Sequence, residues 1–272
     1  MVGSWLIPFS KLMLRGTAAL AYSYFLYWLK KEDLYSQQST FTFSVYSNLK
    51  NYLASSVQCN SEIERFRNSL LYNQKSFTIQ DFGAGSKKVN LQIRPVSKIT
   101  RYSTSSPKFA SLYQYFCKLT PAMHVLELGT CVGITTRYLN QVTKGTLWTI
   151  EGAEALHQIA QSDPIPQKTK FVLGEISEVL PQVMIQIPQL DFALIDANHT
   201  FIGTMRSFES CVEKIHSKSI LVIGDIHWSK EMELAWKAIK NHPSVRLTFD
   251  FFECGVLFFE YSGPKTHLVL DI

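Results

Sequence analysis

Short apolar runs alternate with longer segments of helical spacing from about residue 125 to residue 259. Apolar runs bounded by polar or glycine residues predict buried strands, and the amphipathic segments between them predict crossover helices. Strands are predicted at 125–128, 146–151, 170–173, 190–195, 219–223, 245–249 and 255–259, and helices from Ile134 onward and at 153–161, 201–216 and 230–241. The alternation predicts an α/β fold with a mostly parallel sheet, in which ligands bind at the carboxyl ends of the strands.

The first 120 residues lack this alternation, so we divide the chain into three parts. Residues 1–75 are predicted to be a helical appendage or lid, and residues 76–120 a basic connecting segment. Residues 121–272 are predicted to form the Rossmann-like core. Within the appendage, a helix capped by Ser61 is predicted at 61–72.

The most apolar run lies near the N-terminus, at 17–29, between Arg15 and Lys30. It is shorter than the ~20 residues that a helix needs to cross a bilayer, so no membrane span is expected. No small-residue cleavage site follows it, which argues against a signal peptide. One helical face carries Tyr22, Phe25, Leu26 and Leu29. We expect this helix to pack on the core or on a second subunit, as in a homodimer; attachment to a membrane surface is the alternative, because aromatic side chains suit that boundary.

Composition indicates a globular protein of a reducing compartment. Hydrophobic residues make up 46% of the 272 positions and charged residues 18%, which excludes a disordered chain. The five cysteines are odd in number and form no CxxC pair. This pattern argues against a disulfide scaffold or a structural zinc site and favours a cytoplasmic location.

The net charge of +5 is unevenly distributed. Residues 1–126 carry 15 Lys/Arg and 5 Asp/Glu, or +10, and residues 127–272 carry 12 and 17, or −5. No acid occurs between Phe82 and Met123, where the basic residues are Lys87, Lys88, Arg94, Lys98, Arg101, Lys108 and Lys118. Such a block favours an anionic small-molecule partner, or it is a solvated face. No nucleic acid is expected, because no RNA-binding or helix-turn-helix pattern accompanies it.

Two glycine-rich segments are candidate nucleotide-binding turns. DFGAGS (81–86) follows a short strand-like run but precedes a segment without helical periodicity, so it is predicted to be a loop. ELGTCVG (127–133) lies between a predicted strand and a predicted helix. A ligand-binding turn needs that context, because glycine there lets the backbone approach the ligand.

Acidic residues end several of the predicted strands. Glu151 lies 24 residues after Glu127, at the tip of the next strand, where a carboxylate can accept both hydroxyls of a ribose. Dinucleotide-binding turns have the pattern G-x-G-x-x-G, in which the middle glycine leaves room for a diphosphate. Here Thr130-Cys131-Val132 occupy that place, and their side chains would crowd a diphosphate. A cofactor without phosphate and with a positive sulfonium fits this turn better than a nicotinamide dinucleotide.

From about residue 125 to 259 the chain resembles class I S-adenosylmethionine-dependent methyltransferases. The ELGTCVG turn is most similar to that of small-molecule O-methyltransferases of the catechol and caffeoyl-coenzyme A type. Uncharacterised bacterial methyltransferases that also carry DFGAGS and a DIHWS segment (225–229) extend the resemblance over most of the chain. The resemblance implies a Rossmann-like sheet with an antiparallel last strand and S-adenosyl-L-methionine as cofactor. It also implies methyl transfer to a small-molecule acceptor, with oxygen favoured over nitrogen.

The resemblance also implies the site residues. Cofactor binding is assigned to Glu127, Gly129, Thr130, Gly133, Glu151, Gly152, Glu175, Ile176 and Asp196. The catalytic candidates are Asp196, His199, Asp225 and His227. The metal-dependent members follow their second metal aspartate with asparagine, whereas Ile226 and then His227 follow Asp225 here.

That departure leaves three interpretations open. Asp196, Asp225 and one histidine bind a divalent cation such as magnesium, since carboxylates suit hard cations. Alternatively, His199 or His227 is a metal-free general base, or both histidines only hydrogen-bond loop backbone. A non-catalytic cofactor-binding or scaffold protein is the alternative function, and a nicotinamide-dependent oxidoreductase is a third.

Overall fold

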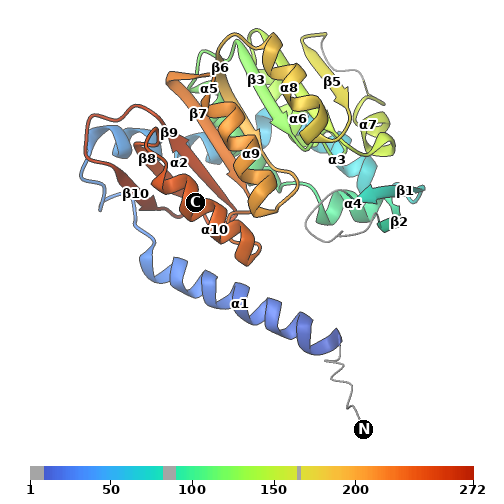
Figure 1. The fold of residues 1–272 in the computed structure, drawn as a ribbon, viewed down its shortest axis with the longest axis horizontal. Helices are drawn as coiled ribbons and strands as arrows, with labels where there is room; N and C mark the ends of the chain where they lie inside the picture. Colours follow the sequence, from blue (N-terminus) through green and yellow to red (C-terminus); the bar gives the residue numbers. More distant parts are fainter. Residues whose placement is uncertain (1–8, 82–89, 164–166) are drawn as a thin grey trace.

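A single mixed sheet organises the C-terminal part of the chain (Figure 1). The computed structural model describes residues 9–81, 90–163 and 167–272, so the DFGAGS turn beyond Asp81 lies outside the described residues. In spatial order the strands are β10 (Thr266–Val269), β8 (Leu247–Asp250), β9 (Cys254–Phe258), β7 (Ile215–Gly224), β6 (Leu190–Ile195), β3 (His124–Leu128), β4 (Thr146–Glu151) and β5 (Thr169–Leu173).

The strand directions confirm the predicted fold class. Strands β7, β6, β3, β4 and β5 are mutually parallel, and β9 pairs antiparallel with both β7 and β8. Strand β10 was not predicted; it adds to the edge of the sheet, parallel to β8. The central strands are buried on both faces; every residue of β6 is buried, and its run 192–195 is apolar.

Helices cover both faces of the sheet. On one face lie α8 (Ile176–Gln186), α9 (Phe201–Val212) and α10 (Lys230–Asn241), which pack on Leu126, Ala193 and Leu221. On the other lie α5 (Pro107–Lys118) and α6 (Ile134–Val142), with α7 (Glu154–Ala160) beside α6. Successive side chains along each strand point to opposite faces of the sheet, so the strands contribute to two separate hydrophobic cores, one on each face.

Two predicted boundaries in this region were wrong. The helix predicted at 201–216 ends at Val212, and β7 already begins at Ile215. Strand β7 extends back this far because Ile215 pairs with Leu190 across a register shift in β6. Helix α8 was not predicted, and it carries Pro181 inside its span.

The first 120 residues contain more regular structure than the sequence indicated. They form α1 (Phe9–Lys30), α2 (Thr40–Cys59), α3 (Ser61–Leu71), the antiparallel pair β1 (Ser76–Asp81) and β2 (Asn90–Pro95), α4 (Val96–Tyr102) and α5. Helix α2 contributes Val45, Tyr46 and Leu49 to the core beneath the sheet. Asn60, not Ser61, occupies the N-cap of α3.

Helix α1 contacts the body of the protein through a different face from the one predicted. The Tyr27 hydroxyl donates to the carbonyl of Leu270 at 2.7 Å, and Tyr24 packs edge-on against Phe252. The predicted packing residues Tyr22, Phe25 and Leu29 are exposed instead. Figure 1 shows α1 extending away from the sheet. Among the described helices, none combines the length and the apolar character needed to cross a bilayer.

Candidate active site

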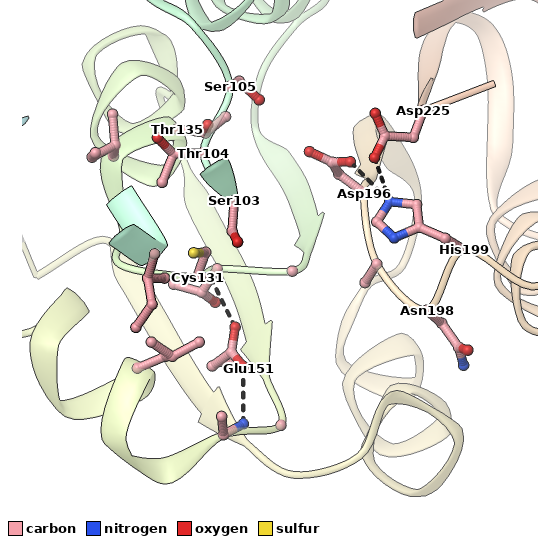
Figure 2. Close-up of a pocket in the computed structure, with 18 of the residues that line it drawn as sticks. Ser103, Thr104, Ser105, Cys131, Thr135, Glu151, Asp196, Asn198, His199 and Asp225 are labelled. Atoms are coloured by element: carbon pink, nitrogen blue, oxygen red, sulfur yellow. Dashed lines mark hydrogen bonds and ion pairs between the residues drawn. The ribbon is translucent and has the colours of Figure 1, made fainter. Parts of the chain in front are cut away.

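A cavity of about 830 Å³ opens at the carboxyl ends of the parallel strands (Figure 2). Each of β3, β4, β5, β6 and β7 contributes residues at or just beyond its carboxyl end. These are Gly129, Thr130 and Cys131; Glu151 and Gly152; Glu175 and Ile176; Asp196 to His199; and Asp225 with Trp228. Its volume falls within the ~300–1,000 Å³ usual for small-molecule sites.

The turn after β3 brings backbone close to the cavity without a side chain. Gly129 has φ +99°, and a Cβ there would lie 2.3 Å from the carbonyl oxygen of Asp196. No other residue type fits, because both the backbone conformation and the contact exclude a side chain. Glycine is therefore required at position 129 because the backbone at the end of the neighbouring strand leaves no space for a side chain.

Glu151 is held in place by backbone donors. One carboxylate oxygen accepts from the amide of Cys131 at 2.8 Å and the other from the amide of Ala153 at 2.9 Å. Burial raises the pKa of Glu151, while these backbone hydrogen bonds oppose that rise. Because a carboxylate accepts about four hydrogen bonds, Glu151 keeps acceptor capacity for a ligand.

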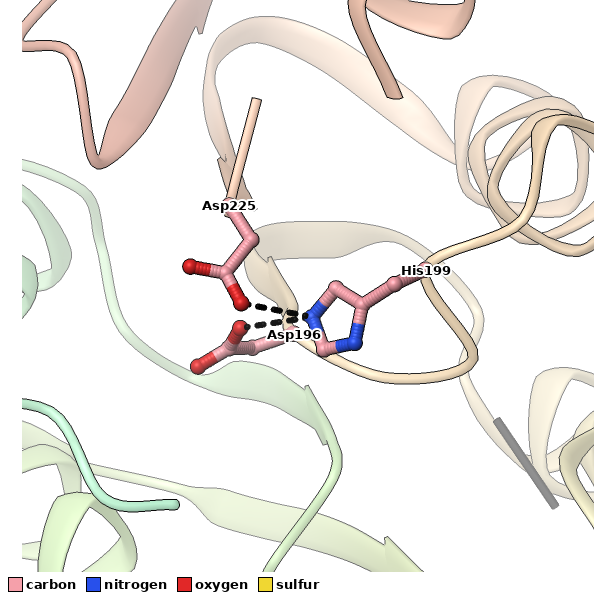
Figure 3. A group of neighbouring side chains, drawn as sticks. All are labelled: Asp196, His199 and Asp225. Atoms are coloured by element: carbon pink, nitrogen blue, oxygen red, sulfur yellow. Dashed lines mark hydrogen bonds and ion pairs between the residues drawn. The ribbon is translucent and has the colours of Figure 1, made fainter. Parts of the chain in front are cut away.

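Asp196, His199 and Asp225 meet on the side of the cavity opposite Glu151 (Figure 2), and Figure 3 shows how the three side chains lie. His199 Nε2 lies 3.4 Å from Asp196 Oδ1 and 3.2 Å from Asp225 Oδ2. Burial and the neighbouring Asp196 charge raise the pKa of Asp225. The two strand ends approach closely because Gly224 has no side chain: a Cβ there would lie 2.1 Å from Asp196 Oδ1.

Unusual backbone conformations gather around this cavity. Four of the non-glycine residues with positive φ line it, at Cys131 (49°), Asn198 (67°), His199 (40°) and Asp225 (53°). Such conformations cost about 1–3 kcal/mol each and persist where surrounding structure fixes them. Their concentration at one cavity supports a functional role for it.

Three predicted site residues lie outside the cavity lining. Gly133 caps α6, and a Cβ there would lie 2.9 Å from the Cβ of Ala160. Glu127 is fully buried behind the turn, and its Oε2 accepts from the hydroxyls of Thr136 and Thr149, both at 2.6 Å. Burial raises the pKa of Glu127 to about 8.

His227 is the third such residue, and its ring is engaged elsewhere. Its Nε2 lies 3.1 Å from Asp250 Oδ2, and the ring stacks on Phe252 with 5.1 Å between centroids. Only His199 of the two candidate histidines therefore joins Asp196 and Asp225. Both follow strand ends in the sequence, and nothing in the residue pattern distinguishes them.

The N-terminal part of the chain supplies the remaining wall, which the sequence analysis did not identify. It contributes Arg94, Tyr102, Ser103 to Ser106 and Tyr113. Ser106 is also the N-cap of α5, where its hydroxyl accepts from the amide of Phe109. The polar run at 103–106 was the sequence signal for this wall, but such a run before Pro107 is equally typical of the start of a helix.

Comparison with known proteins agrees with this architecture. Residues 126–226 match the family described as methyltransferase domain. No curated protein sequence matches the chain. A Staphylococcus aureus protein assigned as a caffeoyl-CoA O-methyltransferase has a similar structure, with a TM-score of 0.52 and 12% identity; the match covers 61% of this chain and 88% of that one.

Two further solved structures are similar at lower scores. An O-methyltransferase from Bacillus cereus in complex with SAH gives a TM-score of 0.48 at 17% identity and covers 58% of this chain and 83% of that one. The O-methyltransferase TomG from Streptomyces achromogenes, in complex with SAM, gives 0.49 at 14% identity, with 58% and 82% covered. The Staphylococcus aureus structure confirms the predicted Rossmann-like fold, and the family match agrees with the predicted resemblance to methyltransferases.

Proposed function

We propose that this chain transfers the methyl group of S-adenosyl-L-methionine to an oxygen of a small-molecule acceptor, because residues 126–226 match the methyltransferase-domain family. One observation carries the proposal: Asp196, His199 and Asp225 converge on the same cavity as the Gly129 turn and Glu151. The residues proposed to bind the nucleoside and those proposed to transfer the proton therefore line the same cavity.

The residues present fit this cofactor. The acceptor capacity left on Glu151 matches a ribose diol, and the Gly129 turn lines the same cavity. Thr130 and Gly152 extend that wall, and Glu175 and Ile176 form the rim where an adenine would lie. The excess of carboxylates around the cavity complements a positive sulfonium.

When bound, this cofactor supplies an electrophilic methyl group that needs no further activation. The protein therefore has to position the acceptor and take up its proton. His199 lies between the two carboxylates, which orient its ring. We assign it the role of proton acceptor, or of ligand when a cation is bound.

We extend the proposal to a divalent cation held by the same three residues. Asp196, His199 and Asp225 each offer one ligand atom, and these atoms all lie within 4.8 Å of one another. Two carboxylates and one imidazole suit magnesium or a first-row transition metal. When bound, such a cation would supply positive charge that stabilises a deprotonated acceptor hydroxyl.

The acceptor is proposed to carry a negative charge. Arg94 lines the cavity from the N-terminal side, and the hydroxyl groups of Ser103 to Ser106 lie on the same wall. Trp228 lies beside His199, with 5.7 Å between ring centroids, and offers an apolar surface to the rest of the acceptor. Both features support an acceptor with an anionic group and a planar body.

A cytoplasmic location is also proposed. The described cysteines Cys117, Cys131, Cys211 and Cys254 are all free. Free thiols at every described position support a reducing compartment.

The test is formation of S-adenosylhomocysteine by the purified chain with a panel of hydroxylated acceptors, half of them carboxylated or phosphorylated. The reaction is run after chelation and again with magnesium or manganese restored. We expect turnover with an anionic acceptor, restored by the cation. Cofactor binding without turnover across the panel would favour the non-catalytic alternative.

A further inference from the structure

Helix α1 presents an apolar face to solvent. Tyr22, Phe25, Trp28 and Leu29 are 63%, 52%, 53% and 57% exposed. Residues 22, 25 and 29 follow one another at spacings of three and four, so they lie along one side of the helix. Phe25 and Trp28 stack on each other, with 6.4 Å between ring centroids. Four large apolar side chains on one helix form an exposed patch of the kind that marks an interaction site.

The opposite side of α1 fixes the helix to the protein. Ser23 donates to Glu233 Oε1 at 2.6 Å, Tyr27 donates to the Leu270 carbonyl, and Lys31 pairs with Asp271 at 2.7 Å. Tyr24 and Tyr27 both pack against Phe252. The exposed face cannot turn inward without breaking these contacts, so it stays available to a partner.

Charge indicates what that partner is. Residues 1–30 contain three basic residues, Lys11, Arg15 and Lys30, and no acidic residue, while Lys31 is paired with Asp271. A surface with negative charge and an apolar layer beneath it complements both properties. Tyrosine and tryptophan also favour the boundary between water and lipid, where one end of the ring is apolar and the other polar. Two copies of α1 would instead bring positive charges together.

We propose that the exposed face of α1 binds the surface of a membrane that contains anionic lipids. The helix lies in the interfacial plane, with Phe25, Trp28 and Leu29 among the acyl chains and Lys30 near the headgroups. Attachment holds the protein on one side of the bilayer without crossing it. This inference is independent of the proposed chemistry.

Flotation of the full chain with lipid vesicles tests the proposal. Vesicles of phosphatidylcholine mixed with phosphatidylglycerol are compared with vesicles of phosphatidylcholine alone. We expect the wild-type chain to float with the anionic vesicles. Replacing Phe25, Trp28 and Leu29 with serine is expected to lower the apparent affinity at least about tenfold, because this change removes most of the inserted apolar surface.

A matched control replaces three exposed apolar residues away from α1, Tyr35, Tyr72 and Ile185, with serine; these are 88%, 85% and 80% exposed. It should float like wild type. A second variant, Lys30→Glu, keeps the apolar face. It should reduce binding to the vesicles that contain phosphatidylglycerol and leave binding to pure phosphatidylcholine vesicles unchanged. The proposal is overturned if wild type stays unbound, or if the triple α1 variant floats equally well. It is also overturned if light scattering shows a dimer that this triple variant dissociates.

Discussion

The two walls of the cavity differ in how they are built. The wall of Gly129, Glu151, Asp196 and Asp225 consists of residues at the carboxyl ends of adjacent parallel strands. The facing wall, which includes Arg94 and the 103–106 segment, comes from a two-stranded ribbon and a helix connection outside the sheet. Sheet topology fixes the first wall, whereas packing between distant segments fixes the second. We therefore assign cofactor and proton chemistry to the first wall and acceptor selection to the second.

The largest expected effect lies at the acidic cluster. Asp225→Asn should lower kcat/KM by about a thousandfold, because it removes one of two charges that hold His199 or a cation. Binding of S-adenosylmethionine should change little. Steady-state kinetics with an identified acceptor measure the effect. His227→Ala serves as the comparison, since that ring faces Asp250; if it were as damaging as Asp225→Asn, the assignment of His199 would fail.

Gly129→Ala should disrupt the cofactor wall sterically. The added Cβ would meet the Asp196 carbonyl in a backbone conformation that alanine rarely adopts. We expect a loss of about 2–4 kcal/mol in the free energy of unfolding, together with loss of cofactor binding. Chemical denaturation followed by titration checks both. Wild-type stability and affinity would show that this turn is not the constraint described.

Glu127 is a buried residue that supports the turn from behind and does not face the cavity. Burial raises its folded-state pKa to about 8, above the ordinary value of 4.5. The stability that its protonated form contributes is complete below about pH 4.5 and is lost as pH rises through about 8. Between these values the free energy of unfolding should fall by up to about 1.4 kcal/mol per pH unit.

Denaturation of wild type and Glu127→Gln over pH 5–9 isolates this contribution. Glu151 and Asp225 also have raised pKa values, so the difference between the two proteins is the relevant quantity. The glutamine variant should show a flatter profile. Parallel profiles would mean that Glu127 is ionised in the folded protein.

The smallest expected effect concerns the second wall. Arg94→Gln should raise KM for an anionic acceptor about tenfold while leaving kcat and cofactor affinity near wild type. Lys98→Gln, an exposed basic residue of the same segment that does not line the cavity, is the matched control. Equal KM values for Arg94→Gln and wild type would remove Arg94 from acceptor recognition.

Sequence patterns anticipated the parts of the fold in which local signals and tertiary structure agree. Helix α10 has the predicted bounds, because Ser229 caps it and its hydroxyl accepts from the amide of Met232. Glu151, Asp196 and Asp225 were placed correctly at strand ends because a buried run followed by an acid is a local signal.

The remainder depends on long-range contacts. Strand β10 exists because its four residues pair with β8, and its own pattern is only partly buried. The contacting face of α1 is set by Phe252 and Leu270, more than two hundred residues away. His199 and His227 differ only in how their loops turn, and Asp225 between them has φ 53°.

Isothermal titration with S-adenosylmethionine tests the central claim most directly, using wild type, Glu151→Ala and the control Glu154→Ala. Glu154 is exposed in the first turn of α7, three residues beyond the cavity carboxylate. The account predicts micromolar binding by wild type and the control, and a loss of at least about a hundredfold in Glu151→Ala, since two ribose hydroxyls lose a charged acceptor. No binding by folded wild-type protein, or equal affinity in all three, would contradict it.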